Sequence, residues 1–227
     1  NPTGVVMSAE KRERLVDLAR RYNFLIVEDC PYRLVRYDDA PIPDTIFSYA
    51  PDVTVFIGSS SKIFCAGPRL GFVIGDDAIV EKIRLFKQTA GYNIPVLCQD
   101  LVCSFVENST VFFNTLTLAM KAQKSKRDLM LKALEDSFSG CSEIRWTVPQ
   151  GGIFIWVELA AGIDTRSIWL AAIEEEGIGI TEGRGFFPAD CLKQNFFRLN
   201  FTFPSEEDIR RGIPKVAAIV KRALELG

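Results

Sequence analysis

The chain has 227 residues, of which 48% are hydrophobic and 25% charged, and its formal net charge is −2. This composition is that of an ordinary globular protein, and it lacks the basic excess of a protein that binds nucleic acid or a membrane surface. The absence of histidine excludes Ser-His-Asp and Cys-His catalysis and disfavours most transition-metal sites. We therefore expect no metal site, no nucleic-acid partner and no membrane partner.

The six cysteines are scattered through apolar stretches without CxxC spacing. This distribution indicates neither a zinc site nor a disulfide framework, and it favours reduced, buried thiols in a cytoplasmic protein. No apolar run approaches the ~20 residues of a membrane-spanning helix, and no signal peptide is visible.

Hydrophobic periodicity predicts alternating helices and strands in the first part of the chain. An amphipathic helix is expected over 8–22, with Ser8 as its cap and Asn23 at its end. Short apolar runs predict strands at 24–28, 53–57 and 70–74. Such runs are typical of a mostly parallel sheet covered on both faces, so the fold class is α/β.

The later part of the chain is predicted to be helical at first and then mixed. The expected elements are helices at 77–89, 96–107 and 110–137, a hairpin at 145–159, a helix at 165–176, a strand at 196–203 and a final helix from Ser205. Pro149-Gln-Gly-Gly152 is expected to form the hairpin turn. We place a domain boundary near residue 115, between a sheet-based domain (1–115) and a smaller α+β domain (116–227).

The stretch with most chemistry is Gly58-Ser-Ser-Ser-Lys62, which leaves the predicted strand 53–57. Ser59 and Ser61 offer hydroxyls, and Arg69 offers a planar charged fork that suits a phosphate. A lysine beside a phosphate site is what a pyridoxal 5′-phosphate (PLP) enzyme needs, because it holds its cofactor as a Schiff base. The alternative is a surface lysine in a Ser/Gly turn.

Further motifs follow the same order as in a known family. They are Asn1-Pro-Thr-Gly4, Glu28-Asp-Cys-Pro-Tyr32, Pro149-Gln-Gly-Gly-Ile-Phe-Ile-Trp156 and Asn195-Phe-Phe-Arg-Leu-Asn200. Together with the lysine stretch they resemble the class I/II aminotransferases, which are PLP enzymes of fold type I. The resemblance covers essentially the whole chain. It implies part of the large-domain sheet of the PLP-dependent transferases, followed by a smaller C-terminal domain.

The resemblance also implies roles around the cofactor ring. Lys62 matches the lysine that bonds the cofactor and later carries the substrate proton, and Asp29 matches the acid at the pyridine nitrogen. Tyr32 and Asn1 match the donors to the phenolic oxygen. Without the resemblance, Asp29 reads as a turn cap, Tyr32 as an ordinary tyrosine and Asn1 as an Asn-Pro turn.

The remaining roles concern the phosphate and the substrate. Ser59, Ser61 and Arg69 match the phosphate cradle, and Arg198 matches the arginine that grips the substrate α-carboxylate. Arg198 lies mid-strand among aromatic and apolar residues, where an arginine calls for a carboxylate partner. The alternative is a structural ion pair with an acid of the small domain.

The sequence departs from the family in two places. Family members carry a long segment ahead of the position of Asn1, so we expect this chain to be the C-terminal piece of a longer enzyme. Ile180-Thr-Glu-Gly183 stands where the family usually has a proline before the glycine, which leaves substrate preference open. Gly151-Gly152 is expected to serve the turn, and Phe186-Phe187 to belong to the core.

We predict transamination between an α-amino acid and a 2-oxo acid by a homodimer with sites at its interface. The residues of these motifs are similar to those of the family branch that acts on aminoadipate, aromatic or branched-chain amino acids. Two alternatives stay open. One is the PLP-sensing domain of a bacterial transcription regulator, and the other is a different PLP reaction such as that of a β-lyase.

Overall fold

The computed structural model describes residues 1–38 and 40–226. These residues form two compact units, Val6–Ala119 and a second unit that joins Asn1–Val5 to Met120–Gly227. The division falls inside the long helix α5 (Ser109–Phe138). The predicted domains, 1–115 and 116–227, stay a prediction. For the site, the important feature is that the first five residues pack with the C-terminal unit.

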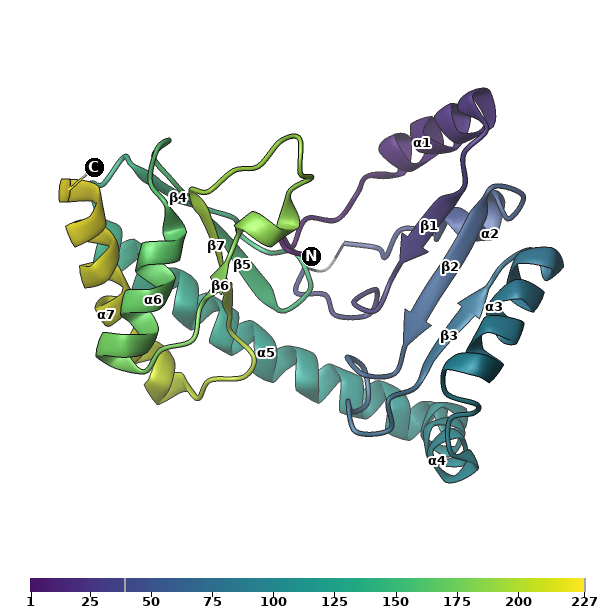
Figure 1. Cartoon of the computed structure of the whole chain (residues 1–227). Helices are drawn as coiled ribbons and strands as arrows, with labels where there is room; N and C mark the ends of the chain where they lie inside the picture. Colours follow the sequence, from purple (N-terminus) through teal and green to yellow (C-terminus); the bar gives the residue numbers. More distant parts are fainter. Residues whose placement is uncertain (39, 227) are drawn as a thin grey trace. The chain divides into compact units, whose positions relative to one another are not determined.

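The first unit is built on a three-stranded sheet in the order β1-β2-β3 (Figure 1). Its strands are β1 (Ile26–Asp29), β2 (Thr54–Ser59) and β3 (Gly71–Ile74). β1 and β2 run parallel, whereas β3 runs antiparallel to β2. A parallel β3 would need a crossover connection, and residues 60–70 are too few for one. The strands and the α/β class are confirmed, and the sheet is mixed.

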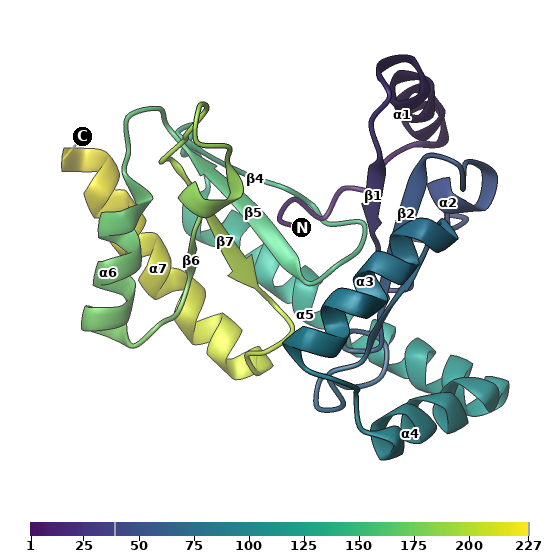
Figure 2. The same cartoon turned by 45° about the vertical axis from the view of Figure 1, so that its right-hand side comes forward.

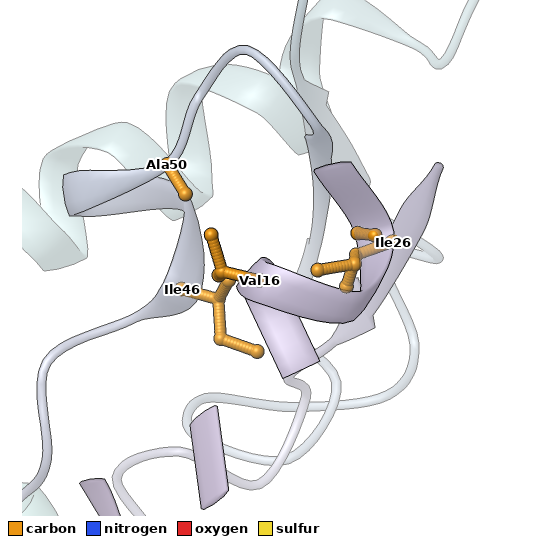
Figure 3. Packing of buried hydrophobic residues seen from close by; sticks show 5 residues of the cluster. Val16, Ile26, Ile46 and Ala50 are labelled. Atoms are coloured by element: carbon orange, nitrogen blue, oxygen red, sulfur yellow. The ribbon is translucent and has the colours of Figure 1, made fainter. Parts of the chain in front are cut away.

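The core of this sheet lies under α1 (Ala9–Tyr22) and α2 (Ile46–Tyr49). Figure 3 shows side chains from these elements and from β1 turned toward one another. The buried cluster consists of Val16, Ala19, Ile26, Ile46 and Ala50. Ser8 caps α1 as predicted, and Asn23 ends it in the left-handed conformation with φ 53°.

Burial alternates along β1, and this corrects one prediction. Ile26 and Glu28 are buried, whereas Val27 is 59% exposed and Asp29 is also exposed. α1 and α2 cover the face that carries Ile26, so the expectation of a strand covered on both faces is wrong for β1 in this chain. The even residues of β1 point into the core, and the odd ones point away from it.

The buried Glu28 ties three elements together. Its Oε1 lies 3.0 Å from Arg12 Nη1 of α1, and its two carboxylate oxygens accept hydrogen bonds from the backbone N–H groups of Ile46 and Phe47. These amides begin α2, where a negative charge is favourable. The side chains of Arg12 and Glu28 are only 13% and 6% exposed. The pair therefore fixes the inward face of β1.

The helices that follow confirm the predicted pattern. They are α3 (Asp77–Ala90), α4 (Val96–Glu107) and α5. None of the helices among the described residues combines the length and apolar character needed to cross a membrane.

The second unit contains a four-stranded antiparallel sheet in the order β4-β5-β7-β6. Figures 1 and 2 show α6 and α7 next to each other along one face of it. The elements are β4 (Ile144–Trp146), β5 (Phe154–Leu159), α6 (Thr165–Glu176), β6 (Thr181–Glu182), the 3₁₀ turn η1 (Arg184–Phe186), β7 (Phe196–Asn200) and α7 (Glu206–Leu226). The predicted hairpin is confirmed, with Gly152 at φ 74° in its turn. Gly177 ends α6 with φ 65°, as expected.

The two faces of this second sheet differ in composition. Alternate residues of β5 and β7, among them Ile155, Val157, Phe197 and Leu199, are buried. The register pairs Trp156 with Arg198 and Phe154 with Asn200, so these four side chains share the other face. This aromatic face, which includes Arg198, is one of two places where candidate functional residues gather.

The prediction of buried cysteines is wrong. Cys65, Cys103 and Cys191 are exposed, and the other cysteines are half-buried. Apolar neighbours in the sequence do not ensure burial, since Leu192 beside Cys191 and Leu101 near Cys103 are themselves exposed. Within residues 1–38 and 40–226, no group of three His, Cys, Asp or Glu side chains is arranged to hold a metal ion.

Candidate functional site

The first group of residues gathers at one edge of the first sheet. Because β1 and β2 are parallel, their carboxyl ends meet there, and the Cys30 N–H donates to the Ile57 carbonyl at 2.9 Å. Asp29 therefore ends β1 close to where Ser59 ends β2. β3 starts with Gly71 opposite Ser59, which brings Arg69 to the same edge. Ligands of α/β sheets bind at this end of the strands.

Lys62 lies in the turn that leaves β2. The turn is closed by the Phe64 N–H, which donates to the Ser60 carbonyl at 2.9 Å. The Lys62 Nζ lies 5.9 Å from the centre of the Tyr32 ring, so the structure brings these two residues together. Tyr32 follows β1 by three residues, and Lys62 follows β2 by three. Their proximity is a consequence of the parallel pairing of β1 and β2.

The three serines of this turn differ in their burial and in their hydrogen bonds. Ser60 is 3% exposed, and its hydroxyl donates to the Leu70 carbonyl at 3.1 Å. Ser59 accepts a hydrogen bond from the Ser61 N–H at 3.1 Å and lies 3.4 Å from the Leu70 carbonyl. Sequence reasoning had not selected Ser60, whose role is to fix the loop between β2 and β3. Ser59 and Ser61, in contrast, are half-buried.

The charged side chains at this edge are exposed. Asp29, Lys62 and Arg69 take part in no ion pair within residues 1–38 and 40–226. Nearby charges behave differently, because Arg12 pairs with Glu28 and Arg36 with Asp38. Arg69 has φ 53°, and its N–H donates to the Ala66 carbonyl at 3.3 Å. A non-glycine residue in this region is uncommon and often marks a functional loop.

The second group lies in the unit that contains the first five residues. Gly4 has φ 70°, and the Gln150 N–H donates to its carbonyl at 3.1 Å. A Cβ atom at Gly4 would lie 2.6 Å from the Cβ of Pro149. Only glycine meets both conditions without strain. The hairpin turn thus holds the start of the chain against the second sheet.

Arg198 is the centre of this group. Its Nη1 donates to Oδ1 of Asn1 at 2.8 Å. Its Cζ lies 3.8 Å from the centre of the Phe154 ring and 4.8 Å from that of Phe186. These rings come from β5 and η1, whereas the sequence had pointed to the aromatic neighbours of Arg198 within its own strand. Phe186, which we expected in the core, is only half-buried and contacts the arginine instead.

The sequence pattern of the family described as aminotransferase class I and II matches residues 1–216. The chain belongs to this family. It is 33% identical over 225 residues to an aromatic-amino-acid aminotransferase from Thermococcus litoralis, covering 99% of this chain and 53% of the relative. It therefore spans about half the length of that relative.

Solved structures give the same assignment. A multiple substrate aminotransferase from Thermococcus profundus superposes with a TM-score of 0.91 at 34% identity, covering 100% of this chain and 55% of that chain. The α-aminoadipate aminotransferase LysN from Thermus thermophilus, solved with N-(5′-phosphopyridoxyl)-L-leucine, superposes with a TM-score of 0.90 at 28% identity, covering 100% of this chain and 58% of that one. Both likenesses confirm the fold type I architecture.

The thiol of Cys30, which lies within the segment 28–32, has a raised pKa. Burial, followed by the negative charge of Glu28, raises the pKa of the Cys30 thiol from 9.0 to about 11. Cys30 lies directly after Asp29, yet its thiol stays protonated at neutral pH. It is therefore unsuited to act as a nucleophile.

Sequence reasoning did not assign three residues that support the two candidate groups, each within its own unit. Phe154 and Phe186 contact Arg198, and Glu28 holds β1 beside Asp29. The sequence pattern could have identified Phe154, because the alternation along 154–159 places it on the same face as Trp156. Phe186 is the last residue of the short 3₁₀ turn η1, and no periodicity in the sequence predicts its position.

Proposed function

We propose that this chain forms the PLP- and carboxylate-binding part of an aminotransferase that moves an amino group from an α-amino acid to a 2-oxo acid. The observation that carries the proposal is the set of Asp29, Lys62 and Arg69 at one sheet edge. These are exposed charges without ion-pair partners among residues 1–38 and 40–226 of a class I/II aminotransferase.

The chemistry of this edge fits PLP. The cofactor has a phosphate dianion, a pyridine nitrogen and an aldehyde, and the edge supplies a guanidinium with hydroxyls, a carboxylate and an amine, respectively. The phosphopyridoxyl compound in LysN supports the same assignment for a related protein. When bound, PLP supplies an electron sink for the bond that breaks at the amino-acid α-carbon.

The residues of the chain supply the remaining work at the cofactor. The Asp29 carboxylate stabilises a proton on the ring nitrogen, because an opposite charge at contact favours the charged form. Tyr32 donates to the phenolic oxygen, and Arg69, Ser59 and Ser61 bind the phosphate. The Lys62 amine would hold the cofactor through its aldehyde carbon, with loss of water, and once the substrate amine had displaced it the free amine would carry the proton that leaves the substrate α-carbon.

Arg198 binds the substrate α-carboxylate through charge-assisted hydrogen bonds, and Asn1 orients its guanidinium from Oδ1 at 2.8 Å. Asn1 is also the proposed second donor to the phenolic oxygen. The substrate class is that of the aminoadipate, aromatic and branched-chain branch. We further propose a homodimer, a cytoplasmic location and the domains 1–115 and 116–227.

The test is an amino-donor screen on the protein expressed from its complete gene and supplied with PLP. With 2-oxoglutarate as acceptor, the account predicts glutamate and the donor's 2-oxo acid in equal amounts, and none from Lys62→Ala. Ammonia and pyruvate released from a β-substituted amino acid without an acceptor would indicate a β-lyase. Cofactor binding without turnover, together with binding to a specific DNA sequence, would indicate a regulator.

A further inference from the structure

The aromatic face of the second sheet surrounds Arg198 more closely than a carboxylate clamp alone requires. The Phe154 ring lies at contact distance, 3.8 Å from the Arg198 Cζ, and Phe186 at 4.8 Å. Both distances are within the range of a cation–π attraction. We infer that Phe154 and Phe186 are positioning residues, which hold the guanidinium of Arg198 in the orientation that receives a substrate carboxylate. The inference rests on the proposed function, because it assumes that Arg198 binds that carboxylate.

The physical reason is the freedom of the arginine side chain. An arginine that must be ordered when a ligand arrives loses rotamer entropy at that moment, and this opposes binding. A guanidinium that ring faces and the Asn1 amide already hold has lost this rotamer entropy during folding, so ligand binding does not require the loss again.

Both rings are themselves held in place. Phe154 lies in β5, paired with Asn200 of β7, and is 9% exposed. Phe186 packs edge-on against Trp156, with ring centres 5.3 Å apart. The turn that carries Phe186 begins at Gly183, where a Cβ atom would lie 2.4 Å from the Phe196 carbonyl oxygen. This close approach fixes the turn against β7 and therefore fixes the ring beside Arg198.

Phe187 provides a matched control. It is half-buried like Phe186, and its ring centre lies 6.1 Å from that of Trp156 and 5.1 Å from that of Phe196. The cation beside it is Lys193, whose Nζ lies 6.0 Å from the ring centre. Replacing Phe187 with leucine removes a comparable amount of packing from the same cluster without removing a ring that contacts Arg198.

The experiment measures binding of 2-oxoglutarate to the PLP-loaded protein from the complete gene by titration calorimetry, without an amino donor. Phe186→Leu is expected to raise Kd about 3- to 30-fold, Phe187→Leu less than about 2-fold, and Phe186→Tyr to restore the original value. In steady-state kinetics, Phe186→Leu should raise KM for the amino donor while kcat changes little. Cofactor content should be the same in all variants.

The inference is overturned if Phe186→Leu and Phe187→Leu weaken binding equally, or if Phe186→Tyr fails to restore it, because the rings would then act through packing alone. It is also overturned if the protein carries PLP on Lys62 but does not bind 2-oxoglutarate. The proposed function fails separately. If Lys62 binds no cofactor while 2-oxoglutarate binding still depends on Phe186, the positioning of Arg198 is supported and the proposed PLP chemistry is not.

Discussion

The two candidate groups of residues differ in how far the protein itself holds their charged side chains. At the edge of the first sheet, Asp29, Lys62 and Arg69 are exposed charges that join no ion pair in the described part of the chain. In the second unit, Arg198 is already bound by the Asn1 amide and by the faces of Phe154 and Phe186. On the proposed function a ligand would complete the first group, whereas contacts within the protein organise the second. Substitutions should reveal this difference, because they should alter ligand binding at the first group and geometry at the second.

The largest expected effect on stability comes from the acid next to Asp29. Glu28→Ala leaves Arg12 without its carboxylate in a site where the arginine side chain is 13% exposed, and this should cost about 3–5 kcal/mol of unfolding free energy. Asp29→Asn should leave the stability unchanged and weaken PLP binding. Urea unfolding and a PLP titration of both variants measure the two effects. Equal destabilisation by both changes would contradict the separation of an inward acid from an outward one.

Arg198 gives the next largest effect. Arg198→Leu should raise the Kd for 2-oxoglutarate about 30- to 1,000-fold, because a desolvated charge pair is lost, and should leave the covalent cofactor in place. Arg69→Leu should do the reverse, weakening PLP binding without changing the Kd for the oxo acid in molecules that carry the cofactor. Calorimetry with cofactor-loaded samples distinguishes them. A loss of both ligands in both variants would show that the groups are not separable.

Gly4→Ala tests how the start of the chain supports the second group. The φ of 70° and the 2.6 Å approach to Pro149 Cβ should make this change cost about 1–3 kcal/mol of stability. Because the displaced segment carries Asn1, the Kd for 2-oxoglutarate should rise with it. Gly162→Ala is a suitable control, since it shares a positive φ of 95° but meets no atom within 4 Å. If oxo-acid binding weakens equally in the control, Gly4 has no special role.

The smallest effect concerns pH. The pKa of Cys30 is raised from 9.0 to about 11, so the folded state keeps a proton that the unfolded state loses between these values. Stability should therefore fall as pH rises from about 9 to 11, and Cys30→Ala should remove part of that fall. At pH 8, alkylation of Cys30 should be slower than that of the exposed Cys65 and Cys191. Mass spectrometry of timed samples measures this, and equal rates would contradict the raised pKa.

Local sequence signals predicted the ends of elements well. Ser8, Asn23 and Gly177 lie at helix boundaries because capping depends on the residue itself and its immediate neighbours. The resemblance assigned Asp29 and Ser59 to one cofactor, and the parallel pairing of β1 and β2 brings the ends of their strands to one edge. The direction of β3 was not predicted, because apolar runs carry no sign of strand direction.

Contacts between distant residues could not be predicted in the same way. Asn1 and Arg198 are 197 positions apart, and no local pattern relates them. The contact of Phe186 with Arg198 depends on an irregular turn, and the inward position of Glu28 depends on α1 and α2 closing over one face of β1. The sequence thus revealed which groups are present, and the folded structure shows which of them the protein itself holds in place.

The most direct test of the account is to locate the cofactor bond. PLP is added to the protein from its complete gene, the bond is reduced with borohydride, and the pyridoxyl label is mapped by peptide mass spectrometry. The account predicts a single label on Lys62, which disappears in Lys62→Ala and persists in Arg198→Leu. Label on other lysines with Lys62 unmodified would contradict the account.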